Sequence, residues 1–265
     1  MRFNILGSGS TGNATLVVSG ETRILVDCGL TAKELAKRLS SINESIENIS
    51  AILITHEHTD HIRGLATLAK NLNIAICISP TTLASAKVFK RDRPEIDIAE
   101  KVQPGQPFEI DHVKIVPVRT PHDAVDPVLF RIESRGVKIA IVTDLGHIPS
   151  HVAYELRSCD ALILEANHDV ELLKSSPYPW SLKQRVMSRQ GHLSNEEMAR
   201  FLREDYDGSA RHIVLAHLSR ENNHPEIATL AAQQALSART PLFAAIEQEK
   251  IKVAHHDRPL GWIEL

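Results

Sequence analysis

Residues 55–61 hold the densest group of side chains able to do chemistry in this chain, three histidines and an aspartate spaced as H-x-H-x-D-H. Neutral imidazoles and carboxylates are ligands of divalent metals such as Zn²⁺, Mn²⁺ and Fe²⁺. His56 and His58 have the spacing to face one metal ion, whereas Asp60 and His61 can turn toward a second. The alternative is a solvated polar turn, which the ligand-type residues elsewhere in the chain make the weaker interpretation.

His122, Asp144 and His217 each follow an apolar run that predicts a buried strand. Residues 55–61 follow such a run as well, Ala51–Ile54. Because strand ends can converge on one edge of a sheet, residues that are distant in sequence can share a site. A single histidine at a strand end is more often structural, so each of these residues is a weak signal by itself. Together, and in this order, they indicate a metal site.

Strands and helices alternate along the chain in the pattern of one α/β domain over residues 1–265, with helices packed outside strands. No linker or internal repeat interrupts it. Thr31 is predicted to cap the first helix, because Glu34 follows three residues later. The predicted strands are 3–6, 14–18, 23–27, 51–54, 74–78, 113–118, 128–132, 137–142, 161–164 and 213–216, and the predicted helices are 31–39, 64–71, 80–88, 195–204 and 225–238.

The composition is that of an ordinary globular protein. The chain has 265 residues and a net charge of −3, so it can bury a core but lacks the basic field of a nucleic-acid coat protein. A nuclease is not excluded, because bound metals add positive charge where a phosphate sits. The sequence has no bilayer-length apolar run and no signal-peptide pattern, which predicts a cytoplasmic protein without a membrane partner. Cys28, Cys77 and Cys159 are predicted to be buried thiols.

The motifs THEHTDH, TPHD, VTDLG and AHLS resemble, in order and across most of the chain, the metal motifs of the metallo-β-lactamase superfamily in its nucleic-acid-processing branch. This resemblance implies a four-layer αββα sandwich with a two-metal site at one edge of the sheets. Further segments resemble the YycJ/WalJ-type exonucleases, above all His217–Asn223, and with it Gly7–Asn13, Glu165–Asp169, Pro177–Arg185 and Gly191–Ser194.

The resemblance also implies a ligand for every position of a dinuclear site. His56, His58 and His122 would hold the first metal, and Asp144 would bridge both ions. The ligands implied for the second metal are Asp60, His61 and His217. No thiolate biases the site toward zinc, so two Zn²⁺ or Mn²⁺ ions are expected, and Fe²⁺ fits as well. Two such ions can clamp a phosphodiester and activate a bridging water.

Three residues are candidates for catalysis beside the metals. Asp60 could orient the attacking water. His192 is the candidate proton donor to the departing oxygen, since ribonuclease Z-like enzymes carry a catalytic histidine in a similar Gly-His segment. Glu165 could orient or tune His192. The alternative for His192 is a structural histidine before a helix capped by Ser194 or Asn195.

Three regions are candidates for substrate contact, and each has a structural alternative. The glycine loop offers backbone N–H groups and hydroxyls to a phosphate, but it could be a plain hairpin connection. Basic and aromatic residues interleave over 174–189, which suits a nucleic-acid strand or the solvated face of an amphipathic helix. The residues after His217 could bind substrate or tie down their loop. The candidates are Ser8, Ser10, Asn13, Lys183, Arg185, Arg220 and Asn222.

The resulting hypothesis is a dinuclear metal-dependent phosphodiesterase that degrades DNA from an end. The DNA preference is implied by the resemblance alone. One alternative is a hydrolase of small esters, thioesters, lactams, lactones or cyclic phosphodiesters on the same fold, because paired metals polarise a carbonyl equally well. Another is a metal-dependent nucleic-acid-binding protein that does not cut. The oligomeric state is left open.

Overall fold

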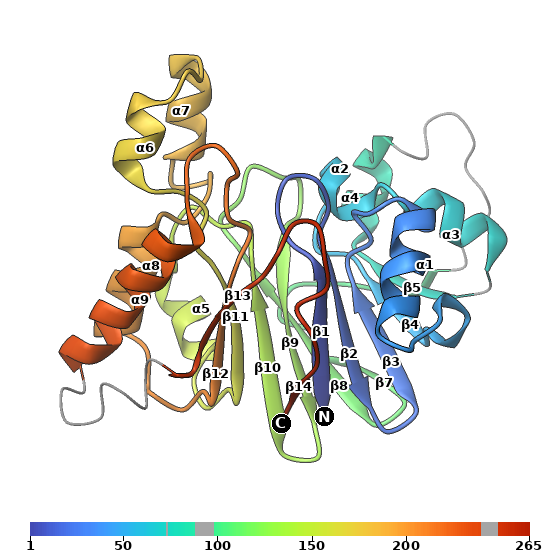
Figure 1. Cartoon of the computed structure of the whole chain (residues 1–265). Helices are drawn as coiled ribbons and strands as arrows, with labels where there is room; N and C mark the ends of the chain where they lie inside the picture. Colours follow the sequence, from blue (N-terminus) through green and yellow to red (C-terminus); the bar gives the residue numbers. More distant parts are fainter. Residues whose placement is uncertain (73, 88–97, 240–248) are drawn as a thin grey trace. The chain divides into compact units, whose positions relative to one another are not determined.

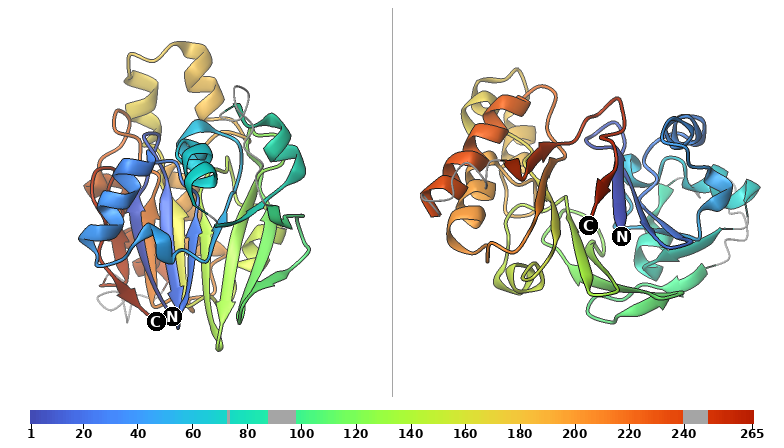
Figure 2. Two further views of the ribbon diagram at one scale, coloured as in Figure 1. Left: turned by 90° about the vertical axis from the view of Figure 1, so that its right-hand side faces the viewer. Right: turned by 60° about the horizontal axis from the view of Figure 1, so that its bottom comes forward.

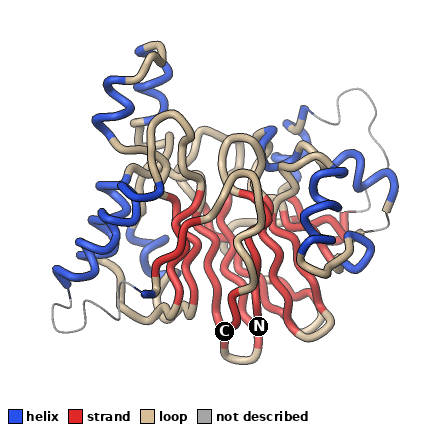
Figure 3. The backbone as a smooth tube through the Cα atoms, viewed as in Figure 1, coloured by secondary structure: helices blue, strands red, loops and turns tan. Residues whose placement is uncertain are grey.

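The computed structural model describes residues 1–72, 74–87, 98–239 and 249–265. Contacts divide the chain into two compact units, each of which combines strands with helices (Figures 1 and 3). The first unit is Met1–Arg119, Ala124–Gly136 and Ala254–Leu265, and the second is Thr120–Asp123 and Val137–Val253. The single domain expected over residues 1–265 stays a prediction.

A seven-stranded mixed sheet frames the first unit. The strands from β14 to β3 pair antiparallel, and those from β3 to β6 pair in parallel. The parallel part puts the carboxyl ends of β3 and β4 at the same edge, where Asp27 and residues 55–61 follow them. The order is β14 (Ile263–Glu264), β1 (Arg2–Gly7), β2 (Ala14–Ser19), β3 (Thr22–Val26), β4 (Ala51–Leu53), β5 (Ala75–Ile78) and β6 (Ile98–Lys101).

The first helix begins where the sequence predicts it. The hydroxyl of Thr31 accepts a hydrogen bond from the backbone N–H of Glu34 at 3.2 Å, which satisfies one of the free N–H groups of the helix. Leu35 and Leu39 join the buried core of the sheet. The unit also contains α1 (Ala32–Ser41), a 3₁₀ helix η1 (Ile46–Asn48), α2 (Thr59–Ile62), α3 (Leu65–Asn71), α4 (Pro80–Ser85) and the antiparallel strands β7 (Phe108–Ile110), β8 (Val113–Arg119) and β9 (Val128–Ser134).

Four parallel strands form the frame of the second unit, so their carboxyl ends share one edge. Nearly every residue of these strands from Ile139 to Ala216 is buried, as the apolar runs predict. Helices α8 and α9 lie side by side along this sheet (Figures 1 and 2). The elements are β10 (Val137–Val142), α5 (Ser150–Glu155), β11 (Ala161–Glu165), α6 (Val170–Ser175), α7 (Trp180–Val186), α8 (Asn195–Glu204), β12 (His212–Ala216), α9 (Pro225–Arg239) and β13 (Ile251–Val253).

The structure differs from the predicted elements in several places, and it adds elements that were not predicted: η1, β6, β7, α5, β13 and β14. Residues 59–62 were expected as loop but form the short helix α2. The sequence did not indicate this helix because so short and polar a segment shows no apolar period. The helix predicted over 80–88 ends at Ser85, and residue 88 lies outside the described residues. Residues 170–186 form two helices, α6 and α7. All three cysteines are buried and free, as predicted.

Candidate active site

Backbone contacts from two other segments hold Asp60 and His61 in place. The N–H of Asn13 donates to the carbonyl of Asp60 at 2.8 Å, and the N–H of Cys28 donates to that of His61 at 2.9 Å. A Cβ on Gly29 would lie 1.5 Å from the oxygen of Asp60, so only glycine permits this approach. The short helix α2 is therefore fixed by the loops that follow β1 and β3.

The carboxylate of Asp27 orients one of the candidate ligands. Its Oδ2 accepts a hydrogen bond from Nδ1 of His61 at 2.7 Å, and its Oδ1 accepts from the backbone N–H of Thr55 at 2.9 Å. Asp27 is 3% exposed and has a φ of 61°, a left-handed conformation that is uncommon outside glycine. The surrounding hydrogen bonds hold Asp27 in this conformation, and its carboxylate in turn fixes the orientation of the His61 ring.

Two imidazole nitrogens of the H-x-H pair converge. Nε2 of His56 lies 3.1 Å from Nδ1 of His58. Nitrogen ligands bound to one tetrahedral zinc at about 2.0–2.1 Å lie roughly 3.3 Å apart, so the pair has nearly the separation that a shared ion needs. Nδ1 of His56 lies 3.0 Å from the hydroxyl of Thr55, which also contacts the carboxylate of Asp27. Thr55 thus donates to Asp27 and accepts from His56, which leaves Nε2 of His56 as the ring nitrogen that could bind an ion.

A second group of ligand-type residues lies at the shared strand edge of the second unit. Asp144, Glu165, His192 and His217 each offer one atom within 4.8 Å of the others. Asp144 and His217 follow β10 and β12 and have φ values of 62° and 56°, so both share the left-handed conformation seen at Asp27. Nδ1 of His217 lies 3.6 Å from Oδ1 of Asp144. The parallel register brings together residues that are more than seventy positions apart.

The buried carboxylate of Glu165 binds two histidines at once. Its Oε1 accepts from Nδ1 of His192 at 2.7 Å and from Nδ1 of His217 at 3.1 Å, and its Oε2 accepts from the N–H of Leu145 at 3.0 Å. Burial alone would raise the pKa of Glu165, but the attraction and hydrogen bond of His192 and the hydrogen bond of His217 outweigh burial and lower that pKa. Glu165 is therefore an ionised acceptor that fixes both rings.

His122 is held from the loop that precedes His192. Its Nδ1 donates to the carbonyl of Gly191 at 3.0 Å, and its Nε2 lies 3.9 Å from Oδ1 of Asp144. Burial lowers the pKa of His122, although Asp144 opposes the shift. A neutral imidazole is the form that a metal ligand requires.

The tautomers of the candidate ligands fit a divalent metal. In His56, His61, His122 and His217 the Nδ1 atom faces an oxygen acceptor. Metal-binding histidines in proteins almost always donate one ring N–H to such an acceptor, which leaves the other nitrogen for the ion. The acceptors are a hydroxyl, two carboxylates and a carbonyl.

Three buried asparagines support the second group, and for Asn223 this agrees with the alternative that the residues after His217 tie down their loop. Nδ2 of Asn167 donates to the carbonyl of His217 at 2.8 Å. Asn195 and Asn223 exchange two side-chain hydrogen bonds, at 2.9 and 3.0 Å. In the sequence, these asparagines stand two positions after Glu165, Leu193 and Glu221. Asparagines placed like this also occur in surface loops, so their position alone did not indicate a supporting role.

The substrate candidates occupy different environments. Ser10 and Arg220 are exposed, whereas Ser8 and Asn13 are buried. Oδ1 of Asn13 accepts from the N–H of Gly9 at 2.8 Å, so this side chain shapes the glycine loop. Their contact with substrate stays a prediction.

Three other substrate candidates have partners within the second unit. Asn222 is 2% exposed and its carbonyl accepts from the N–H of Asp169, which supports the loop-bracing alternative. Lys183 is 9% exposed and its ammonium donates to the carbonyl of Lys174 at 2.6 Å. This placement argues against a substrate contact for Lys183. Arg185 is exposed and forms an ion pair with Asp123.

His168 is a buried histidine near Glu165. It is 1% exposed, and burial lowers its pKa to about 4. A histidine in an unfolded chain titrates near pH 6.5, so the unfolded state binds more protons between pH 6.5 and 4. Stability is complete above this window and falls as the pH drops through it, by about 1.4 kcal/mol per pH unit.

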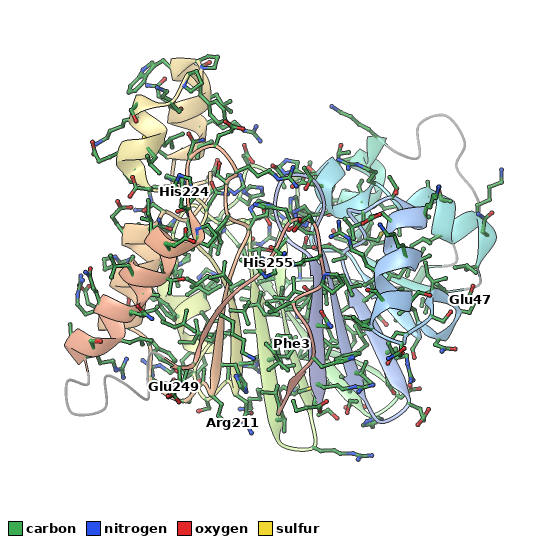
Figure 4. The ribbon with its side chains drawn as sticks, viewed as in Figure 1. Phe3, Glu47, Arg211, His224, Glu249 and His255 are labelled. Atoms are coloured by element: carbon green, nitrogen blue, oxygen red, sulfur yellow. The ribbon has the colours of Figure 1, made fainter. Side chains whose placement is uncertain are left out.

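Replacing His168 with glutamine is expected to flatten this part of the stability profile, because the titrating group is gone. Urea unfolding of both proteins between pH 7 and 4 measures the difference. His224→Gln is the matched control, since His224 is exposed directly before α9 (Figure 4). Equal slopes for wild type and His168→Gln would contradict the prediction.

A model of the β-lactamase superfamily domain matches residues 22–218. The exodeoxyribonuclease YycJ of Bacillus anthracis is 32% identical over 239 residues, 90% of this chain and 90% of that protein. The exodeoxyribonuclease WalJ of Streptococcus pneumoniae is 35% identical over 229 residues, 86% of this chain and 85% of that protein. Zn²⁺-bound PqqB from Methylobacterium extorquens has a TM-score of 0.71 at 17% identity and covers 100% of both chains, a likeness of fold. The predicted metallo-β-lactamase sandwich and the resemblance to YycJ and WalJ are confirmed.

Proposed function

Because this chain belongs to the metallo-β-lactamase superfamily, and within it to the family of the YycJ and WalJ proteins, we propose that it is a metal-dependent phosphodiesterase that degrades DNA from an end. Its family makes it a metal-dependent hydrolase. The observation that carries the finer proposal is the carboxylate of Glu165, which holds a candidate ligand, His217, and a candidate acid, His192. The DNA substrate is supported by the two exodeoxyribonuclease relatives.

The proposed cofactor is a pair of divalent metal ions, Zn²⁺ or Mn²⁺, with Fe²⁺ as a further fit. When bound, such ions stabilise charge on phosphoryl oxygens and lower the pKa of water toward neutrality. Oxygen and imidazole donors suit all three metals, and the ring tautomers described above support the assignment. The proposed ligands are His56, His58, Asp60, His61, His122, Asp144 and His217.

His192 acts in this proposal as the proton donor to the departing oxygen. Its Nδ1 is bound to Oε1 of Glu165, so the proton that it gives up resides on Nε2. Glu165 fixes the direction of the ring through this hydrogen bond, as an orienting carboxylate does for a catalytic histidine. Asp60 is proposed to orient the attacking water through its carboxylate.

Metal removal is the direct test of this function. Protein treated with a chelator is expected to leave end-labelled double-stranded DNA, single-stranded DNA and RNA intact, and added Mn²⁺ or Zn²⁺ is expected to restore the loss of nucleotides from DNA ends. Asp60→Asn should remain inactive with metal present. Asp205→Asn is the matched control, because Asp205 is exposed at the end of α8.

Two outcomes would contradict the proposal in different ways. If the protein binds metal but cuts no polymer, small esters, thioesters and cyclic phosphodiesters become the substrates to test. If metal-loaded protein binds DNA tightly and never cuts it, a binding protein is the better description.

The site of action is proposed to be the cytoplasm, with nucleic acid as the partner. Within the part of the chain that the structure describes, no helix has the length and apolar character to span a bilayer.

A further inference from the structure

Helices α6 and α7 form a hairpin, residues 170–186, that stands away from the parallel sheet of the second unit (Figures 1 and 2). Its two helices are joined by a short connection that contains Pro177 and Pro179, which restrict the backbone. The ammonium of Lys183 in α7 donates to the carbonyl of Lys174 in α6. The hairpin is thus braced by a bond between its helices.

The first residue of α7 leaves a large aromatic side chain in solvent. Trp180 is 63% exposed, although burying an indole is strongly favourable. Tyr178, two residues earlier, is half-buried. A flat aromatic surface held in solvent on a braced hairpin is available for a planar ligand.

The hairpin and the segment after it carry a net positive charge. Their one acidic residue is Glu171, whose carboxylate pairs with the ammonium of Lys174 at 2.8 Å on the exposed face of α6. Residues 172–195 contain two lysines, two arginines and no aspartate or glutamate, in a chain whose net charge is −3. Lys174, Arg185 and Arg189 are exposed. An exposed aromatic within a basic segment matches the surfaces that bind single-stranded nucleic acid, by base stacking and phosphate contact.

The end of α7 contacts the segment that carries His192. The N–H of His192 donates to the carbonyl of Val186, the last residue of α7, at 2.9 Å. A Cβ on Gly191 would lie 2.2 Å from that carbonyl oxygen, so the two backbones touch. Six helical steps from Val186 to Trp180, at about 1.5 Å each, span roughly 9 Å. Along each strand of B-DNA the phosphates advance by about 3.4 Å per nucleotide, so on that scale this length corresponds to about two to three nucleotides.

We propose that Trp180 stacks on an unpaired base about two to three nucleotides from the phosphodiester bond that is cleaved, while Lys174 and Arg189 contact neighbouring phosphates. The inference rests on the proposed nuclease function and adds the place where a frayed strand end is held. Every base has a π-face, so this contact tolerates any sequence. An enzyme that removes successive nucleotides requires such tolerance.

The test measures binding of labelled single-stranded DNA by fluorescence anisotropy, in an Asp60→Asn background that prevents cleavage. Trp180→Ala is expected to weaken binding by about 5- to 150-fold, the range found for loss of one stacked base. A single abasic site is then moved along the positions next to the DNA end. At the stacked position the abasic site should weaken binding to wild-type Trp180, and it should have no further effect on Trp180→Ala.

Two controls separate stacking from a change of fold. Trp180→Phe keeps an aromatic face and should retain most of the affinity. Tyr154→Ala removes another exposed aromatic residue of the same unit, 66% exposed on α5, and should change nothing. The chain has two tryptophans. In Trp262→Phe all tryptophan fluorescence therefore comes from Trp180, and added DNA is expected to quench it.

Three results would overturn the inference. The first is additivity: at every position, the abasic site weakens binding to Trp180→Ala by the same factor as it weakens binding to wild-type Trp180. The second is DNA binding that Trp180→Ala leaves unchanged. The third is a dimer, seen by sedimentation, that Trp180→Ala dissociates, because a second copy would then cover Trp180. In these cases, if the wild type still cleaves DNA with metal present, the inference fails but the proposed function stands. If the wild type neither binds nor cuts nucleic acid, the proposed function itself is contradicted.

Discussion

His192→Ala is expected to slow DNA cleavage by about 10²- to 10⁴-fold, the usual contribution of a general acid. An alkoxide leaves poorly without a proton, and the ring of His192 is held for this transfer by Glu165 at 2.7 Å. The matched substrate is bis(p-nitrophenyl) phosphate, because nitrophenolate departs without a proton. The same variant should therefore lose far less activity on this substrate.

The comparison of two substrates distinguishes a proton donor from a structural residue. If His192→Ala loses the same factor on DNA and on bis(p-nitrophenyl) phosphate, the role of proton donor is contradicted. Metal content of the variant, measured on the same samples, shows whether the loss follows from a missing ion. His224→Ala serves as the control for removing an imidazole, since His224 is exposed.

Asp27→Asn is expected to weaken metal binding by about 10- to 100-fold, the usual cost of removing a partner that orients a ligand. The carboxylate accepts hydrogen bonds on both oxygens, from His61 at 2.7 Å and from Thr55 at 2.9 Å. An amide has one acceptor, so one of these donors would face an NH₂ group. Asparagine tolerates the φ of 61° at this position, which means that backbone strain does not confuse the result.

Competition with a chromophoric chelator measures the affinity of the Asp27→Asn protein for Zn²⁺ and Mn²⁺. Asp111→Asn is the matched control: Asp111 has a φ of 53° and its carboxylate accepts from Thr22 at 2.7 Å. Both variants exchange the same atoms in similar backbone conformations. Equal affinities in the two variants would contradict the role assigned to Asp27. Urea unfolding with chelator present shows separately whether either fold is weakened.

Strands β1–β5 and β8–β12 and the longer helices were predictable because their apolar residues recur with the period of the element. The short strands β6, β7, β13 and β14, of two to four residues, were not predicted. Thr31 and Glu34 marked the start of α1, and the structure has that cap. The helix of residues 59–62 was not predicted, and over 174–189 a single amphipathic helix was one of two open interpretations, where the structure has the end of α6 and all of α7. These helices are short, from four to seven residues, and such helices depend on their packing more than on intrinsic propensity.

Local patterns also misplaced some functional contacts. Lys183 has the charge and neighbours expected of a phosphate contact, yet its ammonium binds the carbonyl of Lys174. No local rule foresees this bond, because it depends on how α6 and α7 pack. Asn195 and Asn223 show the converse: the sequence indicated a possible helix cap and a loop residue, but not that the two side chains pair across 28 positions to brace the loops near His192 and His217.

The sequence by itself determined which donors exist and in what order, because ligand chemistry is a property of residue type: the H-x-H-x-D-H run, His122, Asp144 and His217 could be listed without coordinates. Only the tertiary structure decided which nitrogen of each ring is left for an ion. The partners that fix the rings lie far along the chain, 34 positions for Asp27 and His61 and 52 for Glu165 and His217. The pairing of parallel strands sets these contacts, and strand pairing depends on side chains throughout the core rather than on the motifs themselves.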